Sequence, residues 1–286
     1  MQFKKQKMIP LIFKLIMVIL AWLPAKAQVL EYYPIDDKLQ EISGLELLND
    51  STLIAFNDGG NKSEIYLLNL KGEILRTVDV EDTKNRDWED IAIDKEYVYI
   101  GDIGNNENKR DNLSIVKLKI SDILTRDQVE AETISFRYQE QTAFPPKLEE
   151  MYYDAEGMTI CGDSIWIFTK DRSNPFKGIS LVYKIPKVPG DYTVSSSHKI
   201  EIGMDGWWKD GITAADFHEG LFYLLTYNRY IVMKYQSGGL QLVSEYLFDG
   251  ITQRESIVVL NNQAIFVADE ENPIVGKVLM YKIQPY

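Results

Sequence analysis

The sequence predicts an all-β fold, most simply one β-propeller of five four-stranded blades. Three observations support this prediction. Five related segments recur along the chain, short apolar runs separated by turn residues follow each of them, and one strand-like piece near the N-terminus has no repeat of its own. Short runs of this kind indicate strands, and four strands in about 45 residues are typical of a propeller blade. A sandwich of similar hairpins is the alternative.

Each repeat opens with a segment whose second residue is polar. These polar residues are 46, 67, 57 and 42 residues apart, so the repeats differ in length through their loops. We expect the segment to be the innermost strand of its blade. The five segments are Ile42–Glu46, Trp88–Ala92, Ala155–Thr159, Ile212–Asp216 and Arg254–Val258, and their polar residues are Ser43, Glu89, Glu156, Thr213 and Glu255.

Three further runs complete each predicted blade, with one helix-like stretch between them at Ser121–Gln128. The second strands are predicted at Thr52–Phe56, Tyr97–Ile100, Ile165–Thr169, Leu221–Thr226 and Ala264–Ala268. The third strands are predicted at Ile65–Leu70, Leu113–Ile120, Ile179–Ile185, Tyr230–Tyr235 and Lys277–Ile283. Only four repeats have a fourth run, at Glu73–Val80, Glu130–Tyr138, Tyr192–Ile202 and Leu240–Leu247.

The fifth repeat lacks an outer strand of its own. The unassigned piece Val29–Pro34 is strand-like and would complete this blade. A ring left open would expose two sheet edges, which gives this pairing a physical motive. We therefore predict one propeller domain over residues 28–286.

Residues 1–27 have the features of a cleavable signal peptide. Lys4, Lys5 and Lys7 precede an apolar run at Ile9–Leu23, and Ala25-Lys26-Ala27 gives a small-x-small cleavage pattern. The alternative is a membrane anchor, but the run is short for a span of about 20 residues. The sequence thus predicts cleavage near Ala27-Gln28, no later transmembrane segment, and a secreted, periplasmic or extracellular protein.

Charge and cysteine content narrow the classes of partner. Loss of the signal would remove five lysines and no acid, which changes the net charge from −12 to −17. Such a surface repels nucleic acid and anionic membranes and suits a cation or a cationic partner. Cys161 is the only cysteine, so no intrachain disulfide can form. We expect a monomer.

Propeller geometry would gather the unusual polar residues on one face. The innermost strands and the loops at that end of each blade carry many acids, which a low-dielectric channel tolerates only if they are paired, protonated or bound to metal. Calcium is the candidate cofactor because it accepts carboxylate and amide oxygens in a loose shell. A structural role is the equal alternative, and for Asp58 we favour it. The candidate metal ligands are Glu89, Asp90, Asp102, Asn105, Glu156 and Glu255.

The same face carries aromatic and basic residues that could bind a small molecule or a protein. For the tryptophans, filling the space between blades is the favoured alternative. His198 and His218 are the only histidines, and neither has ligand-spaced neighbours, so zinc and a Ser-His-Asp triad are poorly supported. The candidate ligand-binding residues are Trp88, Lys170, Trp207, Trp208, Tyr227 and Arg254.

The motif residues resemble those of a family of bacterial exported β-propellers. The most specific parts are DWEDIA at Asp87–Ala92 and GDIGN at Gly101–Asn105, and Asp154–Met158 with Phe168–Asp171 continues the likeness. The family is distantly similar to phytase-like and esterase-like propellers. That resemblance implies a face on which acidic residues hold calcium and calcium holds phosphate. The first repeat departs from the pattern, with Ser43 at the marker position.

Three functional hypotheses follow. The first is a non-catalytic exported propeller whose polar face binds a divalent cation and a ligand or protein partner, because no nucleophile–base pair is evident. The second is a calcium-dependent phosphoesterase, a phytase-like hydrolase in which Lys170 would meet a phosphate oxygen. The third is a glycan-binding propeller or glycosidase that uses Trp207 and Trp208 with paired carboxylates.

Overall fold

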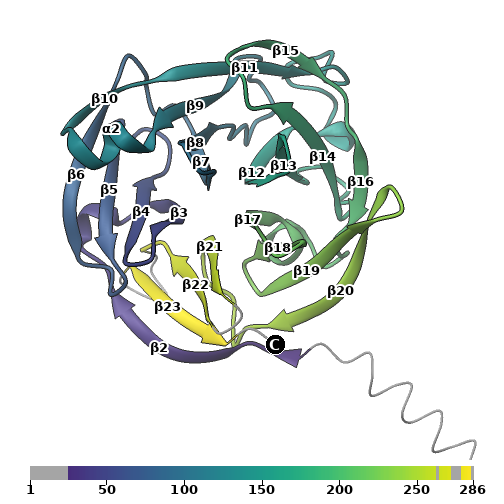
Figure 1. Ribbon diagram of the computed structural model, residues 1–286. Helices are drawn as coiled ribbons and strands as arrows, with labels where there is room; N and C mark the ends of the chain where they lie inside the picture. Colours follow the sequence, from purple (N-terminus) through teal and green to yellow (C-terminus); the bar gives the residue numbers. More distant parts are fainter. Residues whose placement is uncertain (1–24, 262–263, 272–277, 285–286) are drawn as a thin grey trace, which may run out of the picture.

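The computed structural model shows a ring of five β-sheets around a central channel (Figure 1). It describes residues 25–261, 264–271 and 278–284. Much of the expected signal, residues 1–24, therefore lies outside the described residues. The five-bladed propeller predicted from the repeats is confirmed, because each marker segment forms the innermost strand of one sheet.

Each blade is an antiparallel sheet in which strands follow one another outward from the channel. Blade 1 contains β3 (Ile42–Asn49), β4 (Thr52–Asn57), β5 (Glu64–Asn69) and β6 (Ile74–Glu81). Blade 2 contains β7 (Trp88–Ile93), β8 (Tyr97–Asp102), β9 (Leu113–Lys119) and β11 (Glu132–Tyr138). Blade 3 contains β12 (Asp154–Cys161), β13 (Ser164–Lys170), β14 (Ile179–Pro186) and β16 (His198–Glu201). Blade 4 contains β17 (Ile212–His218), β18 (Leu221–Thr226), β19 (Arg229–Gln236) and β20 (Gly239–Leu247).

Blade 5 is closed by the N-terminal strand, as the sequence predicts. It contains β21 (Arg254–Asn261), β22 (Ala264–Asp269), β23 (Leu279–Gln284) and β2 (Gln28–Pro34). β2 runs antiparallel to β23, with Tyr32 opposite Tyr281, and the two strands lie side by side at the bottom of Figure 1. Just before β2, the short β1 (Ala25–Lys26) pairs in parallel with β20, and Ala27 is buried. Cleavage after Ala27 would remove β1 and leave β2 intact.

Two predicted outer strands are each divided between neighbouring blades. β10 (Gln128–Glu130) pairs in parallel with β6 of blade 1, while β11 closes blade 2. Likewise β15 (Gly190–Val194) pairs in parallel with β11, and β16 alone closes blade 3. The predicted single runs Glu130–Tyr138 and Tyr192–Ile202 were therefore wrong in part. Each chain segment first covers the outer edge of the preceding blade, which protects an otherwise unpaired strand edge.

Few helical turns interrupt the sheets. The helix-like stretch after β9 forms α2 (Ile120–Thr125), and α3 (Trp207–Asp210) precedes β17. With six and four residues, neither of these helices could cross a bilayer. Two short 3-10 helices, η1 (Asp37–Leu39) and η2 (Leu148–Glu150), complete the described helical segments.

A β-bulge lies at the marker residue of every innermost strand. The pairing register with the second strand shifts at Ser43, Glu89, Glu156, Thr213 and Glu255. A bulge turns a side chain out of the normal alternation and is common beside functional sites. The repeated polar residue seen in the sequence therefore marks the point where each blade turns a side chain into the mouth of the channel.

Hydroxyl groups at or next to these bulges join neighbouring blades. Ser43 Oγ donates to the carbonyl of Glu89 at 2.6 Å, and Thr213 Oγ1 donates to the carbonyl of Arg254 at 2.5 Å. Ser256 Oγ donates to the carbonyl of Ser43 at 2.5 Å, which links blade 5 to blade 1 across the closure of the ring. These bonds fix the spacing of the inner strands.

Substitution Ser256→Ala should lower the free energy of unfolding by about 1–2 kcal/mol, because the buried carbonyl of Ser43 loses its hydroxyl donor. Chemical denaturation would measure the loss. Ser164→Ala is the matched control, since the Ser164 hydroxyl has no hydrogen bond within the described part of the chain. Equal stability of the two variants would contradict the proposed link.

The centre of the channel is occupied by Asp90. Its Oδ2 atom accepts the backbone N–H of Met158 in blade 3 at 2.7 Å and of Ala215 in blade 4 at 2.9 Å. Its Oδ1 atom accepts the N–H of Ile91. One carboxyl group from blade 2 thus bonds to two other blades.

Candidate functional site

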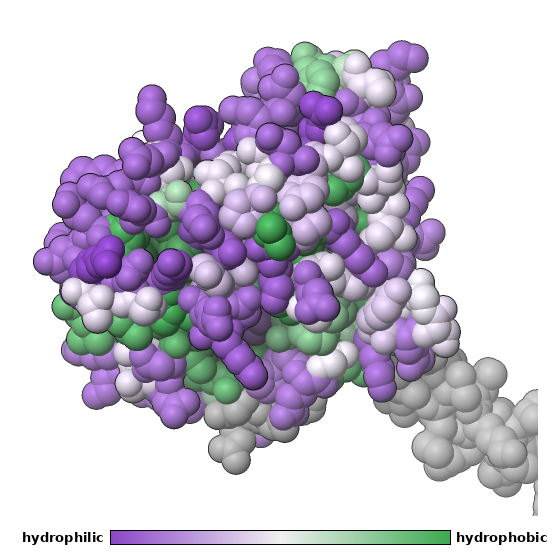
Figure 2. Space-filling view, turned by 45° about the horizontal axis from the view of Figure 1, so that its top comes forward, coloured by the Kyte–Doolittle hydropathy of each residue, from purple (hydrophilic) through white to green (hydrophobic). Residues whose placement is uncertain are grey.

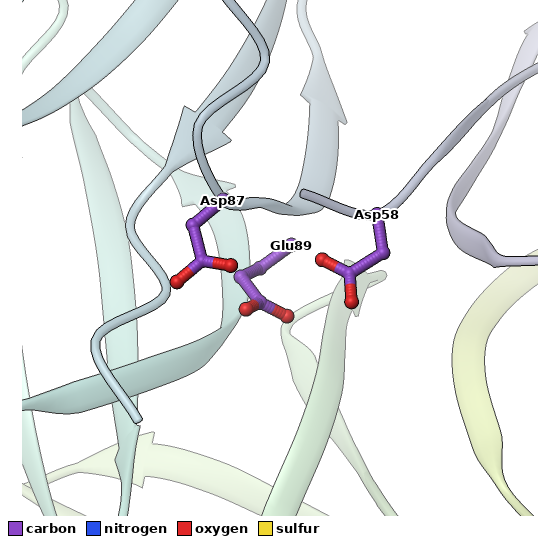
Figure 3. A group of neighbouring side chains, drawn as sticks. All are labelled: Asp58, Asp87 and Glu89. Atoms are coloured by element: carbon purple, nitrogen blue, oxygen red, sulfur yellow. The ribbon is translucent and has the colours of Figure 1, made fainter. Parts of the chain in front are cut away.

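Three carboxyl groups meet at one mouth of the channel. Asp58 lies in the loop after β4, Asp87 lies just before β7, and Glu89 lies at the bulge of β7. One ligand atom from each lies within 4.8 Å of those of the other two, and Figure 3 shows the carboxyl groups turned toward a shared space. We call these three residues the acidic triad. Carboxylate oxygens in this arrangement are suitable ligands for a divalent cation.

Glu89 is the member of the triad that most needs a partner. It is only 6% exposed, yet within the described residues its carboxyl group has no hydrogen bond or ion pair. Its carboxyl oxygens are nevertheless reached by solvent at the mouth of the channel, so a cation could bind them without breaking a contact of this side chain. The side chain therefore meets the condition for a bound cation more clearly than any of its neighbours.

Two glycines allow loops to approach the triad closely. A Cβ atom at Gly104 would clash with Glu89 Oε1 and lie 2.5 Å from Asp87 Oδ2, and one at Gly59 would lie 2.6 Å from Asp87 Oδ1. Any larger residue at either position would displace the carboxyl groups. The lack of a side chain at positions 59 and 104 therefore allows the three carboxyl groups to keep their positions.

The triad retains protons because its members are buried close together. Burial, opposed by the N–H of Gly59 and reinforced by Asp87, raises the pKa of Asp58 to about 7. Burial and the nearby Asp154 raise the pKa of Asp87 to about 6. The pKa of Glu89 is raised well above its usual range by burial and by the charges of Asp58 and Glu156. A cation would replace these protons.

Across the mouth, the marker glutamates of blades 3 and 5 have protein partners. Glu156 Oε2 accepts from Lys170 Nζ at 2.5 Å, and both side chains are almost fully buried. Lys170 Nζ also lies 3.3 Å from the hydroxyl of Tyr227, which donates to Glu255 Oε1 at 2.7 Å. The chain of four side chains Glu156, Lys170, Tyr227 and Glu255 thus satisfies the carboxyl groups of both blades.

Exposed aromatic residues lie above this chain. Trp207 and Trp208 of α3 are 42% and 39% exposed, and their rings meet edge to face. The guanidinium of Arg172 lies 5.0 Å from the centre of the Trp207 ring, and Trp208 packs against Tyr227. These two tryptophans are therefore accessible to a ligand at the same mouth.

The remaining candidate residues of the sequence have structural partners. Trp88 is fully buried against Phe56 between blades 1 and 2. Asp102 pairs with Arg86 and Arg110, and the side chain of Asn105 bonds to the backbone of Tyr153 and Arg110. Arg254 is buried, donates to Tyr281 and the carbonyl of Tyr227, and lies over the ring of Phe248. None of these residues, nor Asp90 at the centre of the channel, belongs to the acidic triad, although Asp102 Oδ1 accepts the N–H of Asp87.

The sequence interpretation placed Glu89 among the metal ligands but left Asp87 out and assigned Asp58 a structural role. The structure brings both aspartates to Glu89. Two signals in the sequence pointed to them: each lies at the channel end of a blade, and the glycines at 59 and 104 allow close approach. Only the distances between loops from different blades reveal the group.

Comparisons with solved structures match the fold. A glutaminyl cyclase from Myxococcus xanthus superposes with a TM-score of 0.58 and 11% identity, over 92% of this chain and 98% of that one. The PQQ-bound aldose sugar dehydrogenase from Streptomyces coelicolor gives 0.53 and 9% identity, over 92% and 99%. At these identities the likeness shows the fold alone. No protein-family model and no curated protein matches the chain.

Proposed function

We propose that this protein is an exported propeller whose acidic triad binds a divalent cation, with calcium the expected ion, and whose aromatic rim binds a ligand beside it. The observation that supports this proposal best is the largely buried side chain of Glu89, whose carboxyl group has no hydrogen bond or ion pair among the described residues. Three carboxylates would supply part of a calcium shell, and water or ligand oxygens would supply the rest. Export rests on the signal-like sequence of residues 1–27.

A binding role is favoured over phosphoester hydrolysis. The phosphoesterase hypothesis assigned Lys170 to a phosphate oxygen, yet its ammonium group lies buried between Glu156 and Tyr227. A phosphate would have to displace one of these partners. The guanidinium group of Arg172 also pairs with Glu156 and with Asp154. In the triad, by contrast, Glu89 has no such partner, although Asp87 lies 3.9 Å from Arg110 Nη1.

Calorimetric titration of the chelator-treated protein with calcium tests the proposal. We expect saturable binding at one site, and stabilisation by about 2.7 kcal/mol when free calcium is about 100 times the dissociation constant. Glu89→Gln should remove both effects, because the amide is nearly isosteric but supplies no negative charge.

Glu46→Gln is the matched control. Glu46 is likewise a glutamate of an innermost strand and is partly buried, but its Oε1 atom accepts the N–H of Leu47 and it is not part of the triad. This variant should bind calcium like the parent protein. Absence of calcium binding by the parent, or unchanged binding by Glu89→Gln, would refute the proposed site.

A further inference from the structure

A wide groove lies at the interface of blades 1 and 2, outside the channel. Its volume is about 840 Å³, which is within the usual range of about 300–1,000 Å³ for small-molecule sites. One wall is the loop 82–86 between β6 and β7, and the other is the face of blade 2 that β9, β11 and β15 form. We call it the interblade groove.

The floor of the interblade groove is a row of polar side chains that crosses blade 2. Ser114 of β9 lies opposite Ser135 of β11, which in turn lies opposite Asp191 of β15. Two residues along, Arg137 lies opposite Thr193 and donates to its hydroxyl at 3.0 Å. The extra parallel strand β15 therefore extends this polar row to the outer edge of the blade.

Ser114 shows that the groove has unmet hydrogen-bonding capacity. The residue is 9% exposed, and its hydroxyl has no hydrogen bond within the described residues. Its oxygen is nevertheless reached by solvent, so it can donate to or accept from a bound molecule. Apolar residues in the same wall contribute little accessible surface, because Leu113 and Phe136 are 1% and 3% exposed. The wall thus offers hydrogen bonds and little apolar area.

Positive and negative side chains balance in the groove, although the chain as a whole is strongly acidic. Neither Lys84 nor Arg137 has an ion-pair partner in the part of the chain that the structure describes. Hydrophilic residues also predominate on the surface in Figure 2, in which the side that carries β11 and β15 is turned forward. The charged residues of the lining are Asp82, Lys84, Arg86, Asp111, Arg137 and Asp191.

From this lining we infer that the interblade groove binds a short neutral oligosaccharide. Each sugar hydroxyl can donate and accept hydrogen bonds, which matches a wall of serine and threonine hydroxyls, carboxylates and guanidinium groups. Equal numbers of charges of both signs do not favour a polyanion, and the scarcity of exposed apolar surface does not favour a lipid.

The groove is separate from the acidic triad, although the two share a wall. Arg86 lines the groove and pairs with Asp102 Oδ2 at 3.1 Å, while Asp102 Oδ1 accepts the N–H of Asp87 at 3.2 Å. Sugar binding in the groove needs no cation. Its test can therefore fail or succeed independently of the calcium proposal.

Binding should be measured on an array of neutral gluco-, manno-, galacto- and N-acetylglucosamine oligosaccharides, with uronic-acid and sulfated oligosaccharides beside them. We expect binding to one neutral series, equal in calcium and in chelator, and confirmation by calorimetry with the same oligosaccharide. Binding to acidic oligosaccharides alone, binding lost in chelator, or no binding to any member would overturn the inference.

Two variants locate the binding. Ser135→Phe would fill the floor of the groove and should abolish binding, while Arg137→Ala should weaken it about ten-fold through the loss of a charged donor. Arg126→Ala, at an exposed arginine outside the groove lining, is the control. The melting temperature of each variant should be close to that of the parent protein, which would show that the variant is folded during the assay. Parent-like binding by both Ser135→Phe and Arg137→Ala would exclude the groove as the site.

Discussion

Asp90→Ala should destabilise the protein by about 3 kcal/mol or more. The substitution leaves the buried N–H groups of Met158, Ala215 and Ile91 without their acceptor, and each unsatisfied donor costs about 1–3 kcal/mol. Because Asp90 joins three blades at the axis, the loss should also loosen the packing of the inner strands. Equilibrium denaturation by urea would measure the change.

Two further variants make this prediction specific. Asp90→Asn keeps one oxygen acceptor in nearly the same shape, so it should lose less stability than alanine. Asp122→Ala removes a carboxylate from the surface of α2, where the ion pair with Arg126 is worth only a few tenths of a kcal/mol. If Asp90→Ala resembled Asp122→Ala, the role of Asp90 as the link between blades would be wrong.

Without a divalent cation, the protein should become less stable as the pH rises from about 5 to 8. Burial raises the pKa of Asp58 to about 7, of Asp87 to about 6 and of Glu270 to about 8, so the folded state holds protons that the unfolded chain releases. Stability from such groups is complete below the unfolded pKa values and is lost as the pH rises through the folded ones. Each group contributes up to about 1.4 kcal/mol per pH unit.

Calcium should cancel this loss, because the cation binds the ionised form of the triad and replaces its protons. Melting temperatures should be measured at roughly pH 5, 6, 7 and 8. They should fall with rising pH in chelator and stay level in calcium. Asp58→Asn should flatten the trend in chelator, whereas Asp163→Asn, in the exposed turn between β12 and β13, should not. Stability that rises with pH in chelator would contradict the proposed protonation.

The fold could be predicted from the sequence because the same residue pattern occurs in each of the five repeats. One polar marker per repeat, such as Glu89 or Thr213, was enough to align the blades and locate what the structure shows to be bulges. The pairing of strands between neighbouring repeats was harder to predict from the sequence. The residues of β15 and β16 form one continuous strand-like run in the sequence, and only the exposed edge of blade 2 explains why β15 pairs there instead.

The site was predicted in part. Repeat alignment correctly indicated that Glu89, Glu156 and Glu255 share one mouth, but not which of them is already satisfied. Lys170 reaches Glu156 from the end of β13, and Tyr227 reaches Glu255 from the turn between β18 and β19. Such contacts leave no pattern in a single sequence. The same holds for Trp88, whose burial against Phe56 depends on the neighbouring blade.

The pairing of β2 with β23 also bears on when the molecule can fold. These strands lie about 250 residues apart in the chain, so the ring stays open until both are free to meet. Contacts this distant in sequence form late and slow the final folding step. If the chain is exported as proposed, an N-terminal segment held by the export machinery would keep β2 from its partner, and blade 5 would be completed only after release.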